Sequence, residues 1–169
     1  FMELVAHRPK ADGFTNATDP GDFAFANADL AFSRRYAFQG GYHGIQVWDI
    51  SDPRAPRIRT TYPCPGGQGD VSIYRNLLFM SVEQPTARID CGATPVTDTL
   101  STERFLGVRI FDISNIDAPK QVAAVQTCRG SHTHTLVPTK NDPDNLYVYG
   151  SGTGTQKTSQ TNQCHDITR

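Results

Sequence analysis

The chain has 169 residues, and its 16 lysine and arginine residues against 17 aspartate and glutamate residues give a formal net charge of −1. A nucleic-acid-binding domain needs a basic excess that neutralises phosphates, so this balance excludes a nucleic-acid partner. The hydrophobic content of 37% favours a strand-rich protein over a helix bundle, and no run approaches the roughly 20 apolar residues of a membrane span.

The predicted strands recur in a fixed order along the chain. Hairpins of two short strands around a tight turn are expected at residues 29–38, 70–82 and 134–149. The spacing is about 40 residues once a polar insertion at residues 84–104 is set aside. The opening residues 2–7 match the position of an outer strand, so they are predicted to complete an earlier unit.

An ungapped motif follows the first two hairpins, at residues 44–56 and again at residues 107–119, and both copies read G-[IV]-x-[VI]-[WF]-D-I-S-x-x-x-A-P. The first half alternates apolar and polar residues, as a half-buried strand does, and the second half has the composition of a turn. A short outer strand is expected after each copy, at residues 57–62 and 120–125. Repeated units of four short strands are typical of a β-propeller.

The sequence therefore predicts one all-β domain, a β-propeller of four-stranded blades, with about two complete blades and parts of their neighbours. The blade parts cover residues 1–28, 29–63, 64–127 and 128–169, and the loop 84–104 is inserted in the third of these. Cys164–Thr168 resembles the start of another inner strand, but it follows His134 too closely for a whole blade. We therefore expect residues to be missing between about Thr155 and Cys164, with a flexible linker as the alternative.

The two motif copies resemble the LVIVD-repeat family of bacterial, mostly exported β-propeller proteins. The resemblance extends to the runs Met2–Pro9, Gly130–Pro138 and Cys164–Thr168. It implies a propeller fold and a location outside the cytoplasm, either extracellular, at the cell surface or in the periplasm. It implies no particular reaction.

The four cysteines lack the paired spacing of a zinc finger, and disulfides in an oxidising compartment are the preferred interpretation, with free thiols as the alternative. They are Cys64, Cys91, Cys128 and Cys164. A bridge between Cys64 and Cys91 would tie an inner strand to the inserted loop. By repeat equivalence, Cys128 would bridge to a later cysteine, and Cys164 is the candidate unless residues are missing.

Three histidines are candidate metal ligands. His132 and His134 are two residues apart, so an extended strand would place both imidazoles on one face. His165 would approach the same rim from the next inner strand. Three imidazoles can hold copper or zinc; the alternative is a hydrogen-bonded turn without metal.

Five aspartates recur at repeat-equivalent positions. Asp49 and Asp112 each precede Ile-Ser, and they are predicted to cap the backbone N–H groups of the following turn. Asp29, Asp70 and Asp166 stand at predicted inner strand starts, where they would bind calcium or remain solvated carboxylates.

Two functions follow from these patterns. The first is a non-enzymatic binding or structural scaffold that contacts a protein or cell-surface component through its loops, above all through 84–104. The second is a metal-dependent oxidase or hydrolase with His132, His134 and His165 around a channel metal. The sequence contains no nucleophile elbow, P-loop or dinucleotide loop, so no catalytic or cofactor-binding residue is assigned. Unpaired strands would also permit an oligomer.

Overall fold

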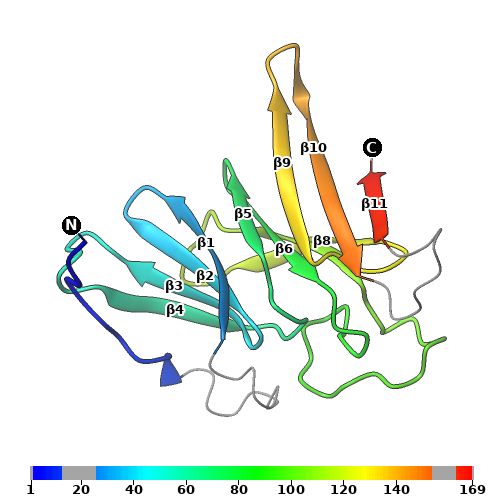
Figure 1. The fold of residues 1–169 in the computed structure, drawn as a ribbon, viewed down its shortest axis with the longest axis horizontal. Coiled ribbons are helices and arrows are strands. Elements are labelled where there is room, and N and C mark those ends of the chain that lie inside the picture. The colour runs from blue at the N-terminus through cyan, green and yellow to red at the C-terminus, as the bar shows by residue number, and fades with distance from the viewer. Residues whose placement is uncertain (1, 13–25, 154–162, 169) are drawn as a thin grey trace.

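The computed structural model describes residues 2–12, 26–153 and 163–168, the last range through its backbone only. Within this part of the chain, eleven strands form three antiparallel sheets and no α-helix occurs (Figure 1). The all-β prediction is confirmed. In the same ranges, no helix has the length and apolar character needed to cross a membrane.

The first two sheets are four-stranded meanders in which sequence neighbours pair. The first contains β1 (Asn27–Ser33), β2 (Tyr36–Gly41), β3 (Gly44–Asp49) and β4 (Arg57–Pro63). The second contains β5 (Val71–Tyr74), β6 (Leu77–Val82), β7 (Gly107–Asp112) and β8 (Lys120–Gln126). The two predicted four-stranded units are therefore present, and the motif supplies the third strand of each.

The repeat extends to irregular details of the backbone. The register between third and fourth strands shifts at Val47/Trp48 in one sheet and at Ile110/Phe111 in the other. The glycine that opens the motif also has a left-handed conformation in both copies, with φ of 132° at Gly44 and 149° at Gly107. A Cβ at Gly107 would lie 2.0 Å from a backbone oxygen, so only glycine fits this position.

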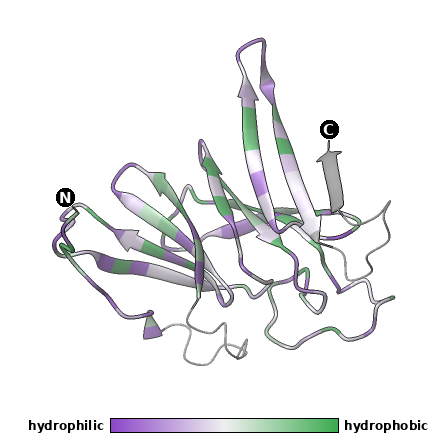
Figure 2. Cartoon of the chain, viewed as in Figure 1, coloured by the Kyte–Doolittle hydropathy of each residue, from purple (hydrophilic) through white to green (hydrophobic). Residues whose placement is uncertain are grey.

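The main core lies between these two sheets. Phe38 and Val47 of the first sheet and Phe111 of the second are fully buried in one apolar cluster. The ring of Tyr62 packs edge-on against Phe111 with a centroid distance of 5.2 Å. Apolar and polar bands alternate along several strands (Figure 2), which is the pattern expected when one face of each strand is buried.

The third sheet has the order β11-β10-β9, with β9 (Thr133–Thr139), β10 (Asp142–Thr153) and β11 (Gln163–Thr168). β9 and β10 form the predicted third hairpin. β11 differs from the prediction, because it pairs with Val148–Thr153 of β10 instead of starting a new sheet. An unpaired strand edge readily accepts such a partner. The predicted break between about Thr155 and Cys164 falls almost wholly outside the described residues.

The predicted outer strand at residues 2–7 does not form, since residues 2–12 contain no strand. This segment instead forms hydrogen bonds with single groups of other parts of the chain. Arg8 Nε donates to the Pro56 carbonyl at 3.0 Å, and the Ala11 amide donates to Gln46 Oε1 at 2.9 Å. The segment is therefore attached by single side-chain contacts and not by a strand ladder.

The first strands of the three sheets meet in the interior of the arrangement. β5 contacts both β1 and β9, and the sheets follow one another from left to right in Figure 1. The described residues do not form a closed ring of sheets, so the propeller architecture stays a prediction. The convergence of β1, β5 and β9 nevertheless brings their polar residues together.

Candidate functional site

A polar cluster lies where the first strands converge. Oδ2 of Asp70, just before β5, accepts a hydrogen bond from the His134 backbone amide at 2.8 Å and lies 3.0 Å from His134 Nδ1. The carboxyl group of Asp29 of β1 lies within hydrogen-bonding reach of that of Asp70. Two of the three aspartates predicted to share the inner edge are thus in contact. Asp166 pairs through its backbone with Gly150, its side chain lies outside the described atoms, and calcium binding stays a prediction.

The two carboxyl groups have opposite pKa shifts. Burial and the hydrogen bond with Asp70 raise the pKa of Asp29. Burial also acts to raise the pKa of Asp70, but hydrogen bonds from His134 and Asp29 outweigh it and lower that pKa overall. Asp70 therefore ionises more readily than Asp29, because two adjacent carboxyl groups avoid a double charge.

Two buried hydroxyls extend the cluster. Ser81 Oγ of β6 lies 2.8 Å from His134 Nδ1 and 2.9 Å from Ser131 Oγ. Ser81 and Asp70 therefore contact the same imidazole nitrogen. In a serine hydrolase the nucleophile and the acid bind opposite nitrogens of the histidine, so this geometry does not provide a nucleophile relay.

The two described candidate metal ligands are each held by a carboxylate. His132 precedes β9, and its Nδ1 lies 2.7 Å from Glu83 Oε2. His134 has Asp70 at Nδ1, while its buried Nε2 has no hydrogen-bond partner among the described residues. A carboxylate on the second ring nitrogen is common in metal-binding histidines.

The third predicted ligand, His165, is placed through its backbone alone. It pairs with Ser151 of β10, which pairs on its other side with Thr133. The register thus brings the chain at residue 165 to the same end of the sheet as His132 and His134. Among the described side chains, no three histidine, cysteine or acidic residues gather around a metal-sized space, and the three-histidine site stays a prediction.

The motif aspartates cap the turns that follow them. Asp49 Oδ1 accepts hydrogen bonds from the Ser51 amide at 3.0 Å and the Ser51 hydroxyl at 2.6 Å. Asp112 accepts one from the Ser114 amide at 2.8 Å. Hydrogen bonds from these serines lower the pKa of both carboxyls. The predicted capping role is confirmed.

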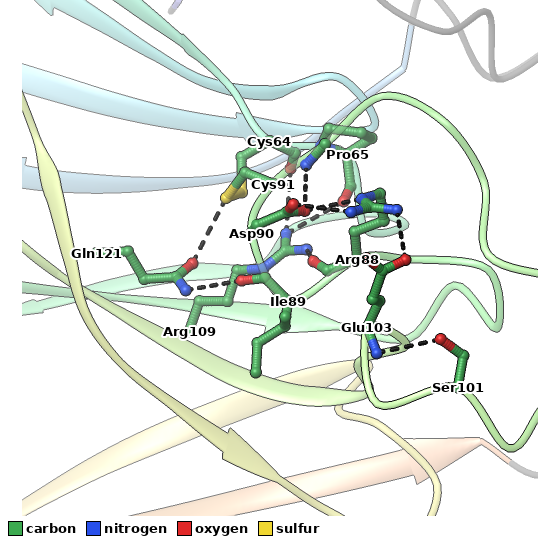
Figure 3. A network of polar contacts seen from close by, with 11 residues as sticks. Cys64, Pro65, Arg88, Ile89, Asp90, Cys91, Ser101, Glu103, Arg109 and Gln121 are labelled. Carbon is green, nitrogen blue, oxygen red and sulfur yellow. Dashed lines mark hydrogen bonds and ion pairs between the residues drawn. A yellow bond between two sulfur atoms is a disulfide. The ribbon is translucent and has the colours of Figure 1, made fainter.

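The inserted loop 84–104 is tied to the sheets by a disulfide between Cys64 and Cys91, as predicted (Figure 3). Cys64 is fully buried in the main core. Cys128 is also disulfide-bonded, but the side chain of Cys164 lies outside the described residues, so that pairing stays a prediction. A buried disulfide is compatible with an oxidising compartment.

A buried arginine provides the second attachment of the loop. Arg109 of β7 is fully buried, and its guanidinium donates to the carbonyls of Cys64 at 3.3 Å, Pro65 at 3.1 Å and Arg88 (Figure 3). Burial lowers the pKa of Arg109 to about 10. Sequence reasoning missed this residue. The sequence signal for Arg109 was its position in the motif, because it is the third residue of its copy, as Gln46 is of the other. In the structure Gln46 is also buried.

Ion pairs close the base of the loop and leave its tip exposed. Arg88 pairs with Asp90 at 2.8 Å and with Glu103 at 3.0 Å (Figure 3). The Ile89 amide donates to the Glu103 carbonyl at 2.8 Å, which joins the two ends of the loop. At the tip, the side chain of Leu100 is 89% exposed.

Comparisons with known proteins identify no family. No family model and no curated protein matches the chain. One similar solved structure is the crystal structure of the computationally designed Ika4 protein, with 13% sequence identity and a TM-score of 0.29. The match covers 74% of this chain and 91% of that one.

Proposed function

We propose that this protein is a non-enzymatic binding scaffold, built of LVIVD-type propeller blades and exported from the cytoplasm. The loop 84–104 is its recognition element, and the partner is a protein or cell-surface component. The repeated four-stranded sheets support the blade architecture, and the buried disulfide supports an oxidising location.

The observation that carries this proposal is the contrast between the base and the tip of the loop. The base is fixed by the Cys64–Cys91 disulfide, by Arg109 and by the Arg88 ion pairs. The tip nevertheless presents Leu100 to solvent. A loop that is already ordered loses little conformational entropy on binding, and an exposed leucine provides apolar contact area for a partner.

The inner polar cluster supports a structural role for the adjoining strands. Ser81, Ser131 and the side chain of His134 are almost inaccessible to solvent, and their hydrogen bonds join β6 to β9. Ser81 and Asp70 share one nitrogen of His134. The cluster thus holds two sheets together, and its two hydroxyl groups are not accessible as nucleophiles.

The test is site-specific photo-cross-linking. A benzophenone amino acid replaces Leu100 in the full chain, with the exposed Asn141 at the β9–β10 turn as the control position. We expect a discrete cross-link to one component of the cell envelope or medium from position 100 alone. Excess unlabelled protein should suppress it and Leu100→Asp protein should not. Equal cross-linking from both positions, or equal competition by Leu100→Asp, would refute the proposal.

The second candidate function, a metal-dependent enzyme, is favoured by one observation. His132 and His134 each have Nδ1 on a carboxylate, and Nε2 of His134 is buried without a partner. With His165 they would hold copper or zinc, which would supply Lewis-acid or redox chemistry when bound. Metal analysis of the purified chain tests this: a stoichiometric metal that is lost in His134→Ala favours the enzyme, and unchanged metal content in that variant contradicts it.

A further inference from the structure

A small pocket lies between the turns of the first two hairpins. Its volume is about 290 Å³, which has room for about ten water molecules. The β1–β2 turn supplies Ser33 and Arg34, the β5–β6 turn supplies Arg75 and Asn76, and the turn after β7 supplies Ser114. All three turns belong to the two complete four-stranded sheets, so the walls of the pocket do not depend on the third sheet.

Two arginines in this pocket have no carboxylate partner. In the described part of the chain, neither Arg34 nor Arg75 forms an ion pair. The guanidinium of Arg75 lies over the ring of Tyr74 at 5.1 Å. The adjacent Arg35, by contrast, pairs with Asp49 at 3.3 Å. None of the described residues that line the pocket is acidic, so two positive charges border one pocket without a negative charge in its lining.

The other polar groups of the lining also favour an acceptor-rich ligand. Ser114 Oγ accepts a hydrogen bond from the Asn76 side chain at 3.0 Å, so its own proton can be donated to a ligand. The carboxylate of Asp112 is held by the caps beside the pocket, since its Oδ1 accepts from the Asn76 side chain at 3.2 Å and from the Ser114 amide at 2.8 Å. The pocket therefore offers mainly hydrogen-bond donors.

The two arginines occupy turn positions that suit other residues better. Arg34 has a φ of 54° and Arg75 a φ of 55°, and both stand directly after the first strand of their hairpin. Glycine, asparagine and aspartate adopt this left-handed conformation more readily, because their side chains meet less steric resistance there. Turn geometry therefore does not explain an arginine at the same position in both hairpins, whereas the shared pocket does.

We propose that this pocket binds one acidic sugar unit, a uronate, of an extracellular polysaccharide. The guanidinium groups of Arg34 and Arg75 bind its carboxylate, and the serine hydroxyls donate to its ring hydroxyls. Tyr36 and Ile116, both half-buried, supply apolar lining for the C–H groups of the ring. A single inorganic anion would leave most of the volume unfilled. This inference rests on the proposed location outside the cytoplasm and makes no use of the loop 84–104.

The test is titration of the full chain with fluorescent hexasaccharides of mannuronate and of galacturonate, with neutral maltohexaose as the uncharged probe. We expect saturable binding of an acidic probe alone, at least tenfold weaker in about 500 mM salt than in about 50 mM salt because salt screens the charges. Arg34→Asn and Arg75→Asn should each weaken binding at least tenfold. Arg57→Asn, which removes the same charge from an exposed residue outside the pocket, should change it less than twofold.

The stability of the variants separates loss of binding from loss of folding. Asparagine suits the left-handed turn positions, so Arg34→Asn and Arg75→Asn should melt at a Tm no lower than that of the wild type. Weaker binding in a fully folded variant then reports on the pocket itself.

Three results would overturn the inference: no saturable binding of either acidic probe, equal binding of maltohexaose, or an equal effect of Arg57→Asn. Displacement of the probe by equimolar inorganic phosphate would show an adventitious ion only and would also refute it. Failure here is distinguishable from failure of the proposed function, because the titration reports on the arginine variants and the cross-linking experiment on position 100.

Discussion

Removing the Cys64–Cys91 disulfide should destabilise the chain by a predictable amount. The bridge joins residues 27 apart in the sequence. On the chain-entropy model, closing such a loop stabilises the folded state by about 3.5 kcal/mol. Cys64 is also fully buried, so alanine at this position adds a small cavity cost, and the double variant Cys64→Ala/Cys91→Ala should lose roughly 3–5 kcal/mol in total.

Urea unfolding followed by circular dichroism measures this change in the free energy of unfolding. For a chain of this length, 3.5 kcal/mol corresponds to a fall in Tm of about 7–14 °C. Thr94→Ala, at an exposed position of the same loop, serves as the control and should change stability by less than about 0.5 kcal/mol. A loss below about 1 kcal/mol in the double variant would refute the reasoning, because the loop would then not depend on its covalent attachment.

Phe111→Ala should cost about 3–5 kcal/mol in urea unfolding, because the ring is fully buried between two sheets; the exposed Val122→Ala should cost almost nothing. Hydrogen bonds from Arg88 and the Gly92 amide lower the pKa of Asp90 to about 2 from a usual 3.8. The stabilisation that ionised Asp90 gives the folded state is therefore complete above about pH 4, and it is lost as the pH falls through 2. The side chain of Asp90 is 55% exposed, although that of Arg88 is only 18% exposed, so solvent screens the pair in part. Between pH 5 and pH 2, the free energy of unfolding of the wild type should therefore fall by at most about 1 kcal/mol more than that of Asp90→Asn. An equal fall in both proteins would contradict the role of the pair. Leu100→Asp should leave Tm within about 2 °C of wild type, since the side chain makes little contact with the fold.

The repeat made most of the fold predictable. Alternation and turn composition around Asp49 and Asp112 located the third strands and the caps, because both depend on local backbone chemistry. The outer strand expected at residues 2–7 did not form. A strand depends on a partner edge, and a local pattern alone does not reveal whether that edge is present.

The candidate site was predictable only in part. Position in the repeat brought Asp29 and Asp70 to the same place, and it identified His134 as an inner-strand residue. The hydroxyl of Ser81 was missed because it approaches from a strand 53 residues away. Arg109 was missed because strand alternation alone does not predict a charged side chain at a fully buried position.

Hydrogen–deuterium exchange on the oxidised chain tests most directly the central claim that the loop 84–104 is a fixed base with an exposed tip. The amides of Ile89 and Phe105 donate to backbone carbonyls within the loop base, so they should be protected to the same degree as those of β6 and β7. Thr97 and Thr99 at the tip should exchange within seconds. Fast exchange of Ile89 and Phe105 together with the tip would show a loose loop and contradict the scaffold account.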